Sequence, residues 1–247
     1  MNCELKRPPE LSGNDLLLQQ LALGLNSVSR WDAVLYHKAN PNLSETDLEH
    51  VIEMRKILNL AKNASPFLRR EIDFDSTDGM IIVHDIGEID TIDMPALHRD
   101  DNSTIVKVRR QEEQIAAEEL IKRVTEPEFQ KRALNLYKRF ENHNGQSYDK
   151  EALLARFIDK FQGDIFFYEN IYKYKDALSD EELKNIKANI PDSLNRVFTP
   201  VFRLLKILKS NQARAELSVL INSAFALYTN NGFNDELQIY IQSVLTN

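Results

Sequence analysis

The sequence is short of the two residues that most often interrupt regular secondary structure. It has seven glycines and eight prolines among 247 residues, a combined share of about 6% that is roughly half the usual value. Tight turns between strands use glycine and proline, so their scarcity argues against a protein built from sheets. We therefore expect an all-α fold with long helices.

Other absences exclude several classes of protein. The one cysteine, Cys3, cannot form an internal disulfide, which fits a reducing compartment. No apolar run approaches the roughly 18 residues that a membrane helix needs, and no signal peptide is apparent. The 31 lysines and arginines are outnumbered by 38 acidic residues, and the net charge of −7 argues against nucleic acid as the main ligand. These observations predict a cytoplasmic protein that acts on neither membranes nor nucleic acids.

The composition otherwise resembles that of an ordinary globular protein. Hydrophobic residues make up 43% and charged residues 28%, and the chain is long enough to bury a full core. No flexible linker divides it, but the character of the sequence changes after Lys175. We expect a helical core over residues 1–175 and a helical extension, packed on that core, over residues 176–247.

Helix signals recur along the chain. Ser44 followed by Asp47 predicts the start of one helix. The segment from about 77 to 89 is predicted to be a core helix, although its apolar run MIIV is also compatible with a short strand. Pro191 is expected to stop one helix of the extension, and Pro200 to interrupt or kink the next.

Polar residues interrupt three of the predicted apolar helices. They are His50, the pair His84 and Asp85, and Asp159. Burying such groups is unfavourable unless each is paired or bound to a metal. Two imidazoles and two carboxylates suit Mn, Fe, Co, Ni or Zn better than Ca or Mg. Glu88 lies one helical turn after His84, where a carboxylate can position a metal-bound water or accept its proton.

The same residues carry a resemblance to a known family. The order His … His-Asp … Asp across successive helices resembles the signature of the HD-domain metal-dependent phosphohydrolases. The stretch from His84 to Asp93 has the pattern H-D-x-x-E-x-x-x-x-D of the 5′-deoxynucleotidase-like branch. Arg30 and Trp31 stand a short segment before the first metal histidine, and the resemblance covers roughly residues 15 to 170.

The resemblance implies roles for particular residues. One divalent transition metal (Mn, Co, Fe, Ni or Zn) would be held in the HD-type core by His50, His84, Asp85 and Asp159. Glu88 would act on the attacking water, and Asp93 would contact the sugar or assist the leaving oxygen. Arg30 would bind the 5′-phosphate, and Trp31 would help shape the nucleoside pocket.

The activity that the resemblance implies is that of a 5′-nucleotidase-like phosphomonoesterase. Such an enzyme hydrolyses a (deoxy)nucleoside 5′-monophosphate to nucleoside and phosphate with metal-activated water. The partner is then a small phosphorylated substrate, a nucleotide. The branch is commonly dimeric, which implies a homodimer.

Two other functions are compatible with the sequence. An HD-fold hydrolase of this kind could act on another phosphorylated nucleotide, either a phosphodiester or a pyrophosphorylated one. Alternatively, the chain could be a non-catalytic helical binding or scaffold protein with a residual metal site, in which a buried His–Asp hydrogen bond merely ties helices together.

Overall fold

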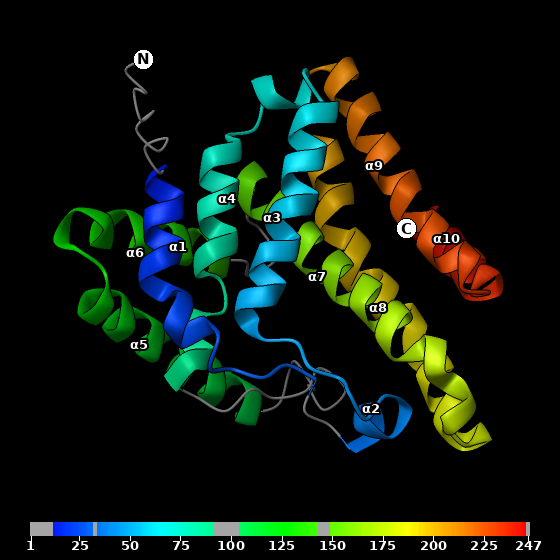
Figure 1. The fold of residues 1–247 in the computed structure, drawn as a ribbon. Coiled ribbons are helices and arrows are strands. Elements are labelled where there is room, and N and C mark those ends of the chain that lie inside the picture. The colour runs from blue at the N-terminus through cyan, green and yellow to red at the C-terminus, as the bar shows by residue number, and fades with distance from the viewer. Residues whose placement is uncertain (1–11, 32–33, 91–103, 143–148, 246–247) are drawn as a thin grey trace, which may run out of the picture.

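The computed structural model describes residues 12–31, 34–90, 104–142 and 149–245, and it is helical almost throughout those ranges (Figure 1). The extended pairing within them is a single antiparallel bridge between Ser29 and Thr46. The predicted all-α fold is therefore confirmed. None of the helices in the described ranges combines the length and the apolar character that crossing a membrane requires.

The α-helices and 3-10 helices follow one another in a single series. They are α1 (Gly13–Leu25), α2 (Val34–Ala39), α3 (Asp47–Ala64), η1 (Leu68–Arg70), α4 (Phe74–Val83), η2 (Ile86–Asp90), α5 (Thr104–Val124), α6 (Pro127–Glu141), α7 (Lys150–Asn170), η4 (Tyr172–Ala177), α8 (Asp180–Ile207), α9 (Asn211–Asn230) and α10 (Asn234–Leu245). Figure 1 shows α7 running through the middle of the molecule, and it contacts α3, α4, α6 and α8. The first part of α7 is buried on several sides because of this central position.

The start of α3 places a histidine in the interior. Thr46 is the N-cap residue and forms a capping box with Glu49, so the predicted start at Ser44 with Asp47 is two residues too early. The cap satisfies backbone N–H groups of the first turn and fixes where the helix begins. His50 therefore lies in the first turn of α3, and its side chain is fully buried.

The helix predicted over residues 77–89 is shorter than expected. α4 ends at Val83, and His84 and Asp85 form a turn before the 3-10 helix η2. The ring Nδ1 of His84 lies 2.8 Å from the carbonyl oxygen of Ile81, one of the carbonyls that a helix end leaves unpaired. A Cβ on Gly87 would collide with the backbone carbonyl of Glu113 in α5, so glycine lets α5 approach this turn.

The prediction that Pro191 stops a helix is wrong, and Pro200 does not interrupt one either. α8 is one helix of 28 residues with both prolines inside it. Its buried face continues past them with Leu194, Val197 and Val201, and α8 packs against α7 and α10. Each proline removes a bond to the carbonyl four residues earlier, a loss of about 3 kcal/mol. Residues 187 and 196, which carry those carbonyls, are exposed, and packing of the opposite face outweighs the loss.

Two glutamates attach the C-terminal helices to the core. Glu71, just after η1, accepts hydrogen bonds from the backbone N–H groups of residues 209–210 at 2.8 and 2.6 Å. Glu216 on α9 accepts from the backbone of residues 67–68 in return. These reciprocal contacts hold α9 against η1. The predicted division of the chain after residue 175 falls inside η4 and stays a prediction.

We expect Glu71→Gln to loosen this attachment in a pH-dependent way. Burial alone would raise the pKa of Glu71, but Lys150 and the two backbone N–H groups lower it from 4.5 to about 2. Because the folded pKa is lowered, the stabilisation is present above pH 4.5 and is lost as the pH falls toward 2. Urea unfolding should show a loss of about 1–2 kcal/mol at pH 7 and less than half of that near pH 3.

The matched control is Glu53→Gln, because Glu53 forms an ion pair with Lys56 on an exposed helix surface. Such pairs contribute little, so this variant should unfold like the wild type at both pH values. An equal loss for Glu71→Gln at pH 7 and near pH 3 would contradict the assigned role of its charge.

Candidate metal centre

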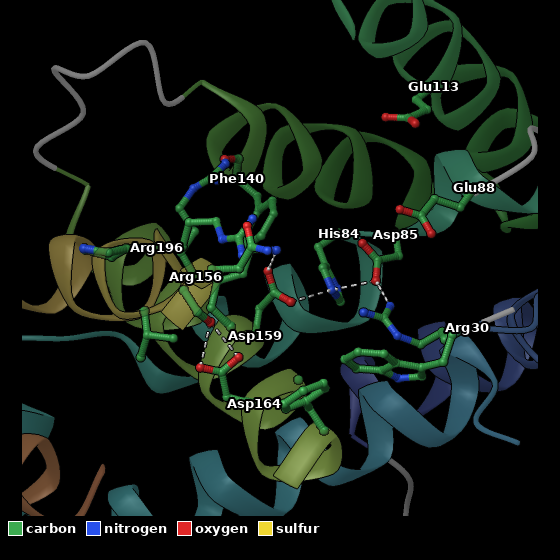
Figure 2. Close-up of a pocket in the computed structure, with 18 of the residues that line it drawn as sticks. Arg30, His84, Asp85, Glu88, Glu113, Phe140, Arg156, Asp159, Asp164 and Arg196 are labelled. Carbon is green, nitrogen blue, oxygen red and sulfur yellow. Dashed lines mark hydrogen bonds and ion pairs between the residues drawn. The ribbon is translucent and has the colours of Figure 1, made fainter. Parts of the chain in front are cut away.

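The structure brings together the four residues expected to bind a metal. His50 comes from α3. His84 and Asp85, from the turn after α4, and Asp159, from α7, are labelled in Figure 2. Nε2 of His84 lies 2.8 Å from Oδ2 of Asp85, and Nε2 of His50 lies 3.3 Å from Oδ1 of Asp159. The two cross distances, His50 to Asp85 and His84 to Asp159, are both 3.9 Å.

Both imidazoles present the same nitrogen to this cluster. Nδ1 of His84 pairs with the carbonyl of Ile81, and Nδ1 of His50 makes a short contact with Oε1 of Gln162. The two Nε2 atoms are buried, and neither has a hydrogen-bond partner of acceptable geometry in the described part of the chain. A buried polar atom left in this way is unfavourable unless something else satisfies it.

The charges of the cluster suit a cation. Burial lowers the pKa of His50, and the neighbouring Arg30 lowers it further. Burial alone would raise the pKa of Asp85, but His84 and Arg30 outweigh it and hold the pKa below its usual range. Burial would also raise the pKa of Asp159, but Lys160 and His50 bring this pKa well below 3.8. Neutral imidazole and ionised carboxylate are the forms that bind metals, and His50, Asp85 and Asp159 favour them. His84 differs: burial would lower its pKa, but the neighbouring Asp85 raises it, so a metal would displace a proton there.

The donor atoms fit a divalent transition metal. One ligand atom each from His50, His84 and Asp85 lies within 4.8 Å of the others, and Oδ1 of Asp159 is close to both imidazoles. Two nitrogens with two carboxylates form a mixed set typical of Mn, Fe, Co, Ni or Zn sites. An ion there would satisfy the two orphaned Nε2 atoms.

Arg30 and Trp31 lie at the edge of the cluster. Nη1 of Arg30 donates to Asp85 at 2.8 Å and to Asp47 at 3.3 Å. Trp31 has a positive φ of 60°, which is rare for a bulky residue, and its indole Nε1 donates to Glu45 at 2.7 Å. Arg30 is therefore close enough to the centre to contact a ligand bound there.

Of the two expected catalytic carboxylates, the structure describes one. Glu88 lies in η2 rather than on a continuous α-helix with His84, and Figure 2 shows its side chain beside Asp85. Ligand atoms of Asp47, Asp85 and Glu88 lie within 4.8 Å of one another. Asp93 lies outside the described residues.

The cluster opens into a cavity of about 430 Å³. Its walls include Arg30 and Trp31 on one side and residues 186–200 of α8 on the other. Asp164 of α7 also lines it and accepts hydrogen bonds from Ser193 at 2.9 Å and from Tyr228. Burial raises the pKa of Asp164. The C-terminal helix α8 thus forms part of the cavity wall.

Sequence reasoning missed three polar residues of the centre. Glu45, Asp47 and Gln162 are between 0% and 4% exposed, and each contacts a predicted site residue. One signal was available for Gln162, which follows Asp159 by three residues and therefore shares its helix face. Glu45 and Asp47 stand where α3 begins, and acidic residues at such positions are ordinary features of a helix start.

Comparison with known proteins identifies the family. The HD domain family matches residues 35–197, about two thirds of the chain, and the chain belongs to that family. The match begins after Arg30 and Trp31 and ends within α8. It includes all four residues of the cluster.

A solved structure has a similar fold. It is the crystal structure of a predicted metal-dependent phosphohydrolase from Magnetospirillum magnetotacticum MS-1, with a TM-score of 0.50 and 16% sequence identity. The similarity covers 87% of this chain and 95% of that one. No curated protein matches the sequence. At this level of identity the likeness concerns the fold alone.

We expect Asp47→Asn to change how stability depends on pH. Burial and the neighbouring Asp85 raise the pKa of Asp47 from 3.8 to about 7. Because the pKa of Asp47 is higher in the folded than in the unfolded state, its ionisation lowers the free energy of unfolding as the pH rises from 3.8 to about 7. In metal-stripped protein, the free energy of unfolding of the variant should therefore increase relative to wild type, by about 1–2 kcal/mol between pH 5 and pH 8.

Asp90→Asn is the control for the loss of one negative charge, because Asp90 is an exposed carboxylate of η2. Its difference from wild type should stay constant over that range. A constant difference for Asp47→Asn as well would show that Asp47 has no raised pKa.

Proposed function

We propose that this protein is a metal-dependent phosphohydrolase. One observation carries the proposal. The Nε2 atoms of two buried histidines, which lack a hydrogen bond of acceptable geometry in the described residues, converge with two carboxylates beside a cavity, in a chain of the HD-domain family. The printed name of the similar solved structure, a predicted metal-dependent phosphohydrolase, supports the same function.

The metal would be held by His50, His84, Asp85 and Asp159. A divalent transition metal bound there supplies Lewis acidity toward a phosphoryl oxygen and lowers the pKa of a bound water. The helices that carry these residues are packed in the core, so the ligands are preorganised. Of the four, His84, Asp85 and Asp159 line the cavity, which leaves the fully buried His50 behind them.

Two charged residues would act on the reacting groups. The carboxylate of Glu88, beside Asp85, would orient the attacking water and accept its proton. Arg30 now donates to Asp85, and its guanidinium would bind the phosphoryl oxygens and offset their charge. Asp93 would act on the sugar or the leaving oxygen, as its place in the motif implies.

The substrate we propose is a (deoxy)nucleoside 5′-monophosphate. A cavity of about 430 Å³ is within the usual size range for small-molecule sites. With the phosphate at Arg30, the nucleoside would lie along Trp31 and Tyr36, whose rings contact each other at 5.4 Å. Ile186 and Ile190 of α8 provide apolar surface on the opposite wall. The products would be a nucleoside and phosphate.

A second candidate substrate is a pyrophosphorylated nucleotide or a phosphodiester. The observation that favours it is a group of further cations along the cavity: Arg156 and Lys160 on α7, and Arg196 on α8. A single phosphate at Arg30 does not need them. The homodimer implied by the family resemblance stays a prediction.

The metal assignment is tested by His84→Ala and Asp85→Ala. Each variant should lose bound metal, measured by elemental analysis, and should release phosphate from nucleoside monophosphates at least about 100-fold more slowly with Mn²⁺ or Co²⁺. His37→Ala removes a histidine outside the cluster and should keep both properties. Full metal content and full activity in His84→Ala and Asp85→Ala would refute the site.

The role of Glu88 is tested by Glu88→Gln, which keeps the size of the side chain and removes the base. Metal content should stay at the wild-type level, while kcat falls about 10²- to 10⁴-fold with KM little changed. Wild-type kcat in Glu88→Gln would remove this residue from the mechanism.

A panel of nucleoside monophosphates, diphosphates and cyclic phosphodiesters, with the products identified, separates the two substrate classes.

A further inference from the structure

A buried chain of hydrogen bonds joins the cavity wall to the metal cluster. The indole Nε1 of Trp31 donates to Oε2 of Glu45 at 2.7 Å. Nε2 of Gln162 donates to Oε1 of the same carboxylate at 2.9 Å, and Oε1 of Gln162 contacts Nδ1 of His50. Glu45, Gln162 and His50 are at most 4% exposed, so water does not compete for these bonds.

The chemistry of the groups fixes the direction of every bond in this chain. An indole N–H only donates and a carboxylate only accepts, so Glu45 accepts at both ends. Gln162 must then turn its NH₂ group toward Glu45 and its carbonyl toward His50. A carbonyl accepts, which requires the proton of the imidazole to be on Nδ1. The lone pair of His50 is therefore on Nε2, the atom that faces the cluster.

Glu45 also holds the segment before α2. Its backbone carbonyl accepts from the N–H of Arg30 at 2.8 Å, and its carboxylate lies 3.7 Å from Nε of Arg30. The next residue, Trp31, has a φ of 60°, an unfavourable conformation that persists only when neighbouring contacts hold it. Those contacts come from Glu45 and from the bridge between Ser29 and Thr46.

We propose that Glu45 is a positioning residue for both halves of the site. Through Gln162 it sets the tautomer of His50, so that Nε2 is free to bind the metal. Through Trp31 and the backbone of Arg30 it fixes the wall that would bind the substrate. This inference rests on the proposed metal site, but Glu45 and Gln162 themselves would touch neither metal nor substrate. Such residues commonly change metal affinity about 10- to 100-fold.

The proposal predicts an unusual result for Glu45→Gln, a change of one atom. The new amide can accept from Trp31 only by turning its NH₂ group toward Gln162. Gln162 must then turn its carbonyl toward residue 45 and its NH₂ group toward His50. That arrangement favours the opposite tautomer of His50, with a proton on Nε2, which blocks metal binding. If the two amides do not turn in this way, one of the buried hydrogen bonds between Trp31 and His50 is lost instead.

Exchanging the two residues should restore the original direction. In the double variant Glu45→Gln with Gln162→Glu, the amide accepts from Trp31 and donates to the new carboxylate. That carboxylate accepts from Nδ1–H of His50, which again leaves the lone pair on Nε2. A residue needed only for packing would not be rescued by this exchange.

The experiment is calorimetric titration of metal-stripped protein with Mn²⁺ and Co²⁺, together with the Co²⁺ absorption spectrum. Glu45→Gln should bind about 10- to 100-fold more weakly than wild type, and the double variant should recover to within about threefold. Glu53→Gln is the matched control, since it makes the same substitution on the exposed surface of α3, away from the site. Its metal affinity should stay within about twofold of wild type, with an unchanged Co²⁺ spectrum.

The outcomes separate the inference from the function on which it rests. If the wild type binds neither ion, the proposed metal site is wrong. If the wild type binds and Glu45→Gln binds equally well, or if a folded double variant does not recover, the role of Glu45 is overturned. If Glu45→Gln does not fold, Gln162→Met is used instead, because it removes the amide that bonds both Glu45 and His50. This variant should bind metal about 10-fold more weakly than wild type. Wild-type affinity in that variant would overturn the inference as well.

Discussion

Ionisable groups in an apolar helical interior impose the constraint on which the rest of this structure depends. His50, Asp47 and Asp159 are at most 4% exposed, and an isolated charge at such a depth is strongly unfavourable. The fold compensates with partners: Arg30 for Asp47 and Asp85, Lys160 for Asp159, and amide or carbonyl groups for Nδ1 of the imidazoles. The two Nε2 atoms lack a hydrogen bond of acceptable geometry in the described residues, and both face the carboxylates of the cluster.

The helices supply the rigidity that this arrangement needs. α7 carries Asp159 and Gln162 on one face and packs between α3, α4 and α8. Asp159, a proposed metal ligand, and Gln162, which supports another, therefore belong to one rigid helix. α8 also lines the cavity, and because it continues through Pro191 and Pro200, one helix contributes lining residues from 186 to 200. Part of the chain after residue 175 thus lines the cavity.

Sequence reasoning succeeded where one local signal decided the outcome. Scarce glycine and proline indicated an all-α fold, and polar residues within apolar helices indicated side chains that do meet in space. It failed where packing overrides local preference: α4 ends at Val83 rather than near residue 89, and α8 continues through Pro191. Glu45 and Gln162 belong to no motif, and their hydrogen bond joins positions 117 residues apart. Such pairs follow from tertiary structure alone.

The two imidazoles differ in how their orientation is secured. Nδ1 of His84 pairs with a main-chain carbonyl, which exists whatever side chain stands at position 81. Nδ1 of His50 depends on the side chain of Gln162, and through it on Glu45. If both histidines bind the metal as proposed, the support of His84 is insensitive to side-chain substitution, whereas the support of His50 depends on two side chains that do not bind the metal. Substitutions at Gln162 and Glu45 would then change metal affinity while all four proposed ligands stay the same.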